Sequence, residues 1–399
     1  MTRRTEQALS RSDLAQLLIA QGLAPGIGSP LRDLPAAFPD SALQADMRGR
    51  GWLDQSWRAA LEALCHPYLL INSATATADR ISAPFYAASS AAPDRLTAIA
   101  PAEDGYRLSF PWTTKEIALE DCIALDVDSA PFPDIPTLEL TPAGLMALAA
   151  AADAVRLVLL TSIMQRQVVA DFLLPVDHLT VMYRLSVEDT QADGRWLVTL
   201  LRLLAPHSFQ IGDGGSASRL TSGYRELAGL GLLRDEGNGK WSPSANLMRL
   251  SGHWMTPVPA IAHEVVTFED RQETTTHRLT LRGSGPLCVI AFEEAPMPKA
   301  RLRSLEPGAY WLELFGMLSP PVPEEAAAAG ATPATTSQCP ACGTMVREGQ
   351  KFCSECGASL DRALPATAAS PPTCASCGAP LEPGLRFCTQ CGNPITRSR

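Results

Sequence analysis

The chain has 399 residues, of which 46% are hydrophobic, and its formal net charge is −9. This length exceeds that of one ordinary domain, and the hydrophobic content suffices for a substantial core. The acidic balance disfavours proteins that hold nucleic acid through its phosphates, because such proteins normally carry basic surfaces.

The first part of the chain, residues 1–135, is predicted to form an α+β half. Apolar periodicity and turn signals predict two helices followed by strands, at Leu43–Leu53, Trp57–Leu64, Tyr68–Ile71 and Arg95–Ala100. Residues 136–210 are predicted to form a helical middle, because Pro142–Val168 is rich in Ala and Leu and Arg195–Leu204 is apolar.

Residues 211–318 are predicted to form a second α+β half. A helix at Leu220–Leu233 precedes Arg234–Trp241, a predicted hairpin with Asn238-Gly239 at its tip. This combination resembles a winged helix. A further helix and three strands are predicted at Ser244–Leu250, His263–Phe268, His277–Leu281 and Leu287–Phe292.

A weak internal repeat connects the two halves. A shift of 191 positions takes Asp79-Arg80 onto Asp270-Arg271, and it takes Leu96, Ile99 and Ala100 onto Leu287, Ile290 and Ala291. We therefore expect residues 1–318, called the body below, to be an α+β structure of two related halves with winged-helix-like segments. This organisation faintly resembles the EspG-type chaperones of type VII secretion, which pair two similar α+β halves.

The apolar stretch Leu145–Met164 is the strongest candidate for a membrane span. Asp153 and Arg156 interrupt it, and a buried helix accommodates such charges better than a bilayer does. We expect no membrane span. No signal peptide is recognised at the start of the chain, so we expect a cytoplasmic location and reduced cysteines. Cys65, Cys122 and Cys288 lie in apolar runs and are predicted to be buried thiols.

The remaining eight of the eleven cysteines form two copies of one pattern at an offset of 35 residues, within residues 319–399, called the tail below. Each copy has two Cys-x-x-Cys pairs, which is the ligand set of a closed tetrahedral zinc site. The candidate ligands are Cys339, Cys342, Cys353 and Cys356 in the first copy, and Cys374, Cys377, Cys388 and Cys391 in the second. Residues 339–360 and 374–395 are therefore predicted to be two small β zinc ribbons, with linkers at 319–338 and 361–373.

Within each copy, glycines at equivalent positions allow sharp turns, and Phe352 or Phe387 supplies almost the only large apolar side chain. Units this small need metal to fold. The two segments resemble the short zinc ribbons found singly or doubled at the ends of many bacterial and archaeal proteins, called double zinc ribbon domains. This resemblance implies two structural Zn²⁺ per chain, in modules that dock protein or nucleic acid or serve as inert tails.

Other interpretations of the cysteines fit less well. A rubredoxin-like iron site needs a larger aromatic core, and redox Cys-x-x-Cys chemistry expects one pair on a helix. A catalytic zinc needs an open coordination position, which four cysteines do not leave.

No catalytic constellation is recognised. His263-Glu264-Val265-Val266-Thr267 approaches a zinc-protease motif but lacks its final histidine, and its β-branched residues favour a strand. We expect a bacterial adaptor or chaperone-like protein that binds a protein partner and is not an enzyme. The alternative is a transcription-associated protein that binds nucleic acid with its winged helix and ribbons. An enzyme with a site assembled from distant residues is a third possibility.

Overall fold

The structure is a computed structural model. It describes residues 4–34, 37–77, 81–168, 172–175, 196–210, 216–255, 258–269, 272–320, 336–338 and 345–347. The chain divides into two compact units, Met1–Gly330 and Ala331–Arg399. The division falls inside the predicted linker 319–338, and the finer domain boundaries stay predictions.

The start of several helices follows from local side chains. Helices α1 (Arg11–Gln21) and α4 (Thr114–Ala124) each begin with a capping box, formed by Ser10 with Asp13 and by Thr113 with Glu116. Helix α5 (Pro142–Gln165) begins after Thr141, whose side chain accepts the backbone N–H of Gly144, and it has proline at its first position. These caps satisfy backbone donors that a helix leaves free at its N-terminus.

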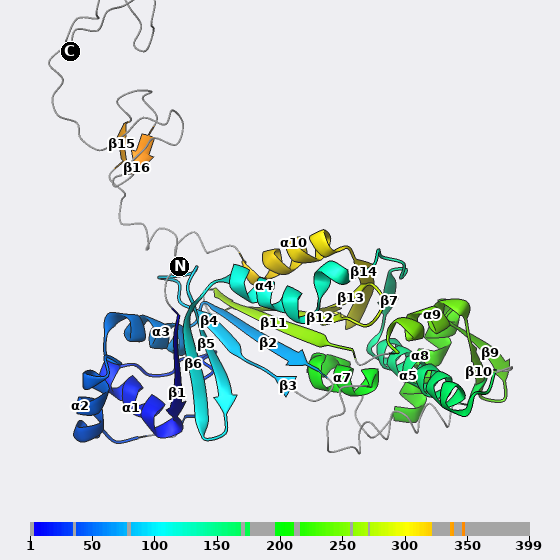
Figure 1. Cartoon of the computed structure of the whole chain (residues 1–399), viewed down its shortest axis with the longest axis horizontal. Helices are drawn as coiled ribbons and strands as arrows, with labels where there is room; N and C mark the ends of the chain where they lie inside the picture. The colour runs from blue at the N-terminus through cyan, green and yellow to red at the C-terminus, as the bar shows by residue number, and fades with distance from the viewer. Residues whose placement is uncertain are drawn as a thin grey trace, which may run out of the picture. The chain divides into compact units, whose positions relative to one another are not determined.

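Eleven of the described strands form one antiparallel sheet across the body (Figure 1). Its order is β1-β6-β5-β4-β2-β11-β12-β13-β14-β7, and β3 pairs with β2 beside this path. The strands that come first in the chain are β1 (Thr5–Ser10), β2 (Leu69–Ala76), β3 (Ile81–Ser82), β4 (Phe85–Ala88), β5 (Leu96–Ala102) and β6 (Gly105–Trp112). The others are β7 (Leu138–Leu140), β11 (Ala260–Glu269), β12 (Gln272–Leu281), β13 (Leu287–Glu293) and β14 (Lys299–Leu305).

The two predicted halves meet at the centre of this sheet, where β2 pairs with β11 from Leu69↔Thr267 to Ala76↔Ala260. From this pair outward, one side runs β2-β4-β5-β6-β1 and the other runs β11-β12-β13-β14-β7. On each side the outermost strand precedes the other strands in the chain. A shift of 191 residues carries β2 onto 260–267 in β11 and β5 onto β13. The strand order thus repeats along the chain with the same offset as the sequence matches.

Helices cover both faces of the sheet (Figure 1). Helices α4 and α10 (Pro307–Leu318) contact each other and pack on one face, where Ile117, Tyr310 and Leu314 are buried. The opposite face packs against α1, α2 (Ser41–Gly49) and α3 (Gln55–Cys65) over the first strands. Over the later strands the cluster on this face includes α5, α7 (Leu197–Leu204) and α9 (Ala245–His253), and α8 (Ser216–Gly229) packs on α5. The body is therefore an α+β structure.

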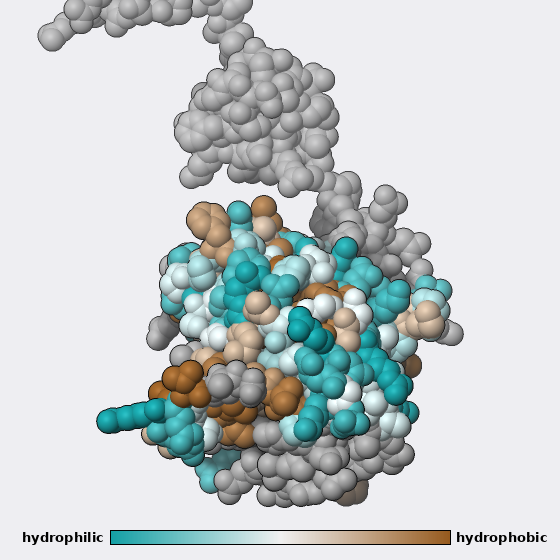
Figure 2. Space-filling view, turned by 90° about the vertical axis from the view of Figure 1, so that its right-hand side faces the viewer, coloured by the Kyte–Doolittle hydropathy of each residue, from teal (hydrophilic) through white to brown (hydrophobic). Residues whose placement is uncertain are grey.

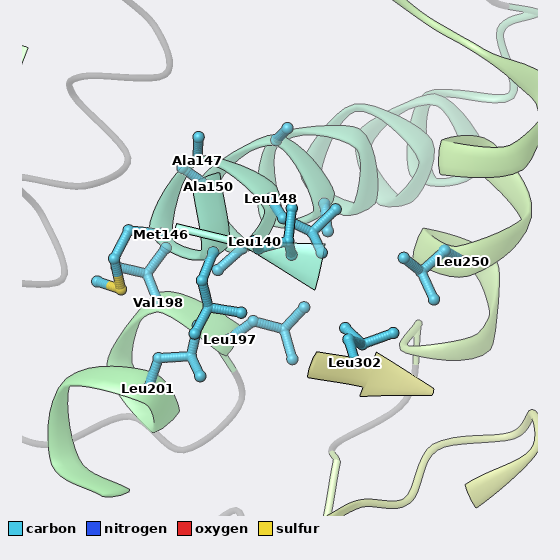
Figure 3. Packing of buried hydrophobic residues seen from close by; sticks show 14 of the residues in the cluster. Leu140, Met146, Ala147, Leu148, Ala150, Leu197, Val198, Leu201, Leu250 and Leu302 are labelled. Atoms are coloured by element: carbon cyan, nitrogen blue, oxygen red, sulfur yellow. The ribbon is translucent and has the colours of Figure 1, made fainter. Parts of the chain in front are cut away.

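Helix α5 lies at the centre of the largest hydrophobic cluster. In Figure 3, Met146 of α5 lies beside Val198 of α7, and Leu302 of β14 and Leu250 of α9 belong to the same packed interior. One helix of the described chain, α5, is long and apolar enough to cross a membrane, and 72% of its most apolar window is buried within the protein. Such burial is typical of a core helix.

Helix α8 approaches α5 closely at Gly223. A Cβ atom added to Gly223 would lie 2.6 Å from the Cβ of Ala147 and would also meet the carbonyl oxygen of Ala143. Because real Cβ atoms do not approach this closely, the two helices can keep their separation only with glycine at this position.

We expect Gly223→Ala to lower the free energy of unfolding by about 1–3 kcal/mol, because the helices must move apart. The matched control is Gly229→Ala at the end of the same helix, where an added Cβ meets nothing within 4 Å. That change should be neutral or stabilising by up to about 1 kcal/mol. Urea unfolding of both variants measures the difference, and equal values for the two would contradict the close approach.

Several predicted boundaries need correction. The helix predicted at Leu43–Leu53 ends at Gly49, because Gly51 adopts a positive φ of 75° that stops it. The helix predicted at Leu220–Leu233 runs from Ser216 to Gly229, and Leu233 already begins strand β9. The predicted hairpin is present as β9 (Leu233–Gly237) and β10 (Lys240–Pro243), with positive φ at Asn238 and Gly239 in its turn. In the predicted linker, Thr336–Gln338 forms a strand, β15.

Candidate functional site

The zinc ligands predicted from the sequence lie outside the described residues. This holds for Cys339, Cys342, Cys353 and Cys356, and for Cys374, Cys377, Cys388 and Cys391. Their assignment as ligands stays a prediction.

Two described strands of the tail flank the first cysteine pair in the sequence. Strand β15 pairs antiparallel with β16 (Met345–Arg347), from Thr336↔Arg347 to Gln338↔Met345. Cys339 and Cys342 come between these two strands in the sequence. A hairpin connection that carries Cys-x-x-Cys can bring two thiolates to one metal ion, as a zinc ribbon requires.

The three cysteines of the body differ in kind from those of the tail. Cys65 and Cys288 are buried and Cys122 is half-buried, and all three are free thiols. Burial raises the pKa of Cys65 to about 11 and that of Cys122 to about 11, and it raises the pKa of Cys288 further. Their thiolates, the form that attacks or binds metal, are therefore disfavoured at neutral pH.

Three histidines of the body, His253, His263 and His277, lie beside carboxylates. His263 lies in strand β11, as the β-branched sequence predicted, and not in a helix. Its Nε2 is 2.8 Å from Oδ2 of Asp121 on α4, and its side chain is fully buried. His253 lies 3.2 Å from Asp134. Among the described residues no group of three or more His, Cys, Asp or Glu is placed to hold a metal ion.

A buried ion pair within α5 also contacts the start of α7. Nη1 of Arg156 is 2.6 Å from Oδ1 of Asp153, and both side chains are at most 3% exposed. Asp153 also accepts the backbone N–H groups of Leu197 and Val198, at 3.1 and 3.0 Å, and so caps the N-terminus of α7. Burial raises the pKa of Asp153 to about 6 despite these partners. These contacts give the pair a structural role.

An open groove of about 1050 Å³ crosses the middle of the sheet and extends to the end of α7. Asn72 and Ala74 of β2 line it from the first half of the body, and Ala262 and Glu264 of β11 line it from the second. The lining continues through β12, the end of β13 and residues 203–207. Strands far apart in the chain, β2 and β11 to β13, build it together.

The groove is acidic. Its described lining includes Glu264, Glu273, Glu293 and Glu294 but no lysine or arginine. Nε2 of His277 lies 2.9 Å from Oε1 of Glu294 and 3.9 Å from Oε1 of Glu264. Nδ2 of Asn72 donates to Glu264 at 3.4 Å, whereas the buried Oδ1 of Asn72 accepts no hydrogen bond.

Comparison with known protein families identifies one region of the chain. Residues 339–392 match the family described as Double zinc ribbon. This segment is therefore a zinc-binding module of that type, as the cysteine spacing predicted. No curated protein sequence matches the chain.

Among solved structures, the chain is similar to a chain of the complex described as the Mycobacterium tuberculosis type VII secretion system chaperone EspG5 with the PE25–PPE41 dimer. The identity is 11% and the TM-score 0.42, over 79% of this chain and 96% of the other. The structural comparison thus finds the class of chaperone that the body faintly resembles in its sequence.

Proposed function

We propose that the protein is a zinc-binding adaptor or chaperone-like protein of the cytoplasm, whose body binds a protein partner. Its two zinc ribbons act as docking modules and not as catalytic centres. The observation that carries the proposal is the match of residues 339–392 to the double zinc ribbon family. Four thiolates per site close the coordination shell, so each zinc would stabilise a small surface without activating a substrate.

Exposed hydrophobic surface on the body supports a protein partner. At the end of α5, Ile163, Met164 and Val168 are 67, 84 and 93% exposed. Hydrophobic residues also gather in one area of the face shown in Figure 2, while the rest of that face is mainly hydrophilic. Contiguous apolar surface of this kind commonly marks contact sites for other proteins.

The organisation of the body fits a binding scaffold. We infer from the repeated strand order that the body consists of two related halves, with α8, β9 and β10 as a winged-helix-like segment of the second. The groove lies where these halves meet. The contact of Asp121 with His263 joins α4 to β11, and Asp153, paired with Arg156 within α5, caps α7, which suits a structural role better than a catalytic one.

A test uses full-length protein and a full-length Cys339→Ser/Cys374→Ser variant, which lacks one ligand in each zinc site. A partner captured from a lysate of the source organism is identified, purified and titrated calorimetrically against both proteins. If the ribbons and the body both contact the partner, binding at one site raises the effective concentration at the other. The variant should then bind the partner about a hundredfold more weakly. Equal affinity would make the ribbons passive, and failure to form a stoichiometric complex from purified components would overturn the proposal.

A second candidate function is nucleic-acid binding, which the helix α8 followed by the β9–β10 hairpin favours. Arg219 and Arg225 on α8 and Arg234 on β9 are exposed. In the same segment, the hairpin also carries the exposed acidic residues Asp235 and Glu236. Salt-sensitive retardation of duplex DNA in a gel, abolished by Arg219→Gln/Arg225→Gln, would favour this function over the adaptor.

A further inference from the structure

The groove between the two halves combines an apolar floor with carboxylates. Ala74 of β2, Ala262 of β11 and Phe292 of β13 contribute apolar surface to its lining. Ala74 is paired with Ala262 in the β2–β11 register, so these two small side chains lie together on one face and leave room above the sheet. A ligand in the groove therefore meets apolar surface beneath it.

The carboxylates of the groove are spread along the strands. Glu264 is paired with His277 of β12, and Glu273 lies four residues before His277 on the same strand and the same face. At about 3.4 Å per residue, the positions of Glu264 and Glu273 are separated by roughly 13 Å along the sheet. A single compact cation cannot contact both.

Asn72 adds a polar side chain to the same lining. Its Nδ2 donates to Glu264 at 3.4 Å, whereas its Oδ1 is closed off from solvent and has no hydrogen-bond partner. The amide group therefore orients the Glu264 carboxylate, and its oxygen does not itself contact a ligand in the groove.

We propose that this groove binds an extended, lysine- or arginine-rich segment of a partner polypeptide. Lysine and arginine combine an apolar stem with a cationic head that donates hydrogen bonds, which matches the alanine floor and the glutamates. In an extended chain, residues four apart are separated by about 13 Å, so basic residues at this spacing reach Glu264 and Glu273 together. The inference rests on the proposed function, because it specifies the chemistry of the partner.

The test measures binding of fluorescent peptides to the full-length protein at low ionic strength by fluorescence anisotropy. The probe has lysine at every fourth position, separated by Thr-Val-Thr, which favours an extended chain. A peptide with glutamate in place of lysine is the negative probe, and spermine is the competitor that represents a free polyamine. The groove variant is Glu264→Gln/Glu273→Gln. The control variant, Glu62→Gln/Glu103→Gln, removes the same charge from exposed positions outside the groove.

We expect the lysine peptide to bind the wild-type and control proteins equally and the groove variant about tenfold more weakly, since two partly exposed ion pairs are lost. The glutamate peptide should not bind. Equal weakening in both variants would show a non-specific response to net charge and would overturn the proposal. Absence of lysine-peptide binding, or complete competition by spermine at equal concentration, would overturn it as well.

These outcomes are separable from those for the proposed function. A captured partner that binds the wild-type protein and the groove variant with equal affinity leaves the adaptor function intact and refutes the groove as its site. Peptide binding that depends on Glu264 and Glu273, without any reconstituted partner complex, supports the groove and refutes the proposed function.

Discussion

Removal of zinc is expected to unfold the two ribbons of the tail and to leave the body folded. Each ribbon has 22 residues with one large aromatic side chain, Phe352 or Phe387, so hydrophobic burial cannot hold it. Structural zinc contributes about 10–16 kcal/mol in isolated zinc-finger peptides, and this binding free energy is also folding free energy. After chelation, limited proteolysis should digest the tail, while the thermal unfolding transition of the body stays at the same temperature.

Metal analysis provides the quantitative form of this prediction. The purified protein with reduced cysteines should contain two zinc ions per chain, and Cys339→Ser should reduce this to one. Cys122→Ser, which changes a half-buried thiol in the body, should retain both ions. A zinc content near zero in the wild-type protein, or a loss of zinc from Cys122→Ser equal to that from Cys339→Ser, would contradict the assignment of the ligands.

Breaking the buried ion pair within α5, whose Asp153 caps α7, should have the second largest effect. Arg156→Met leaves the Asp153 carboxylate in a site where it is 1% exposed, without its cation. Removal of one partner from a buried pair typically costs 3–5 kcal/mol, so we expect the free energy of unfolding to fall by about that amount at pH 7. The control is Arg50→Met, which removes an exposed pair with Asp46 and should cost less than about 1 kcal/mol.

The pH dependence distinguishes this mechanism from a simple loss of packing. The pKa of Asp153 in the folded protein is raised to about 6, above its unfolded value of 3.8. The folded state therefore binds the proton more tightly, and this group lowers the free energy of unfolding as pH rises from about 4 to 6. Without Arg156 the pKa should rise further, so the deficit of Arg156→Met should shrink from pH 7 to pH 5 in urea unfolding. A deficit that does not change with pH would point to packing alone.

Local signals carried most of the correct predictions. The Ala- and Leu-rich sequence of Pro142–Val168 predicted α5, and Asn238-Gly239 predicted the turn between β9 and β10, because these features act through neighbouring residues. The cysteine spacing identified the double zinc ribbon for the same reason. Helix α4 was not predicted, although its capping box of Thr113 and Glu116 was visible in the sequence.

The groove could not be predicted in the same way, because its residues come together only through sheet pairing. Asn72 and Glu264 are 192 positions apart in the chain and become neighbours when β2 pairs with β11. The position of His277 between Glu264 and Glu294 likewise depends on the register of β11, β12 and β13. The weak repeat of 191 residues was the one sequence signal that related these strands to each other.

The pairing of β2 with β11 gives the body the strand arrangement of a two-fold symmetric dimer within a single chain. In a true homodimer, every substitution near the central strands would appear twice, and the surface across the two-fold axis would be the same on both sides. Here the two central strands have separate sequences, so Asn72 and Ala74 can face Glu264 and Ala262 across the same junction. A single chain with this topology can evolve a directional site at its centre, one that distinguishes the two ends of whatever lies across it.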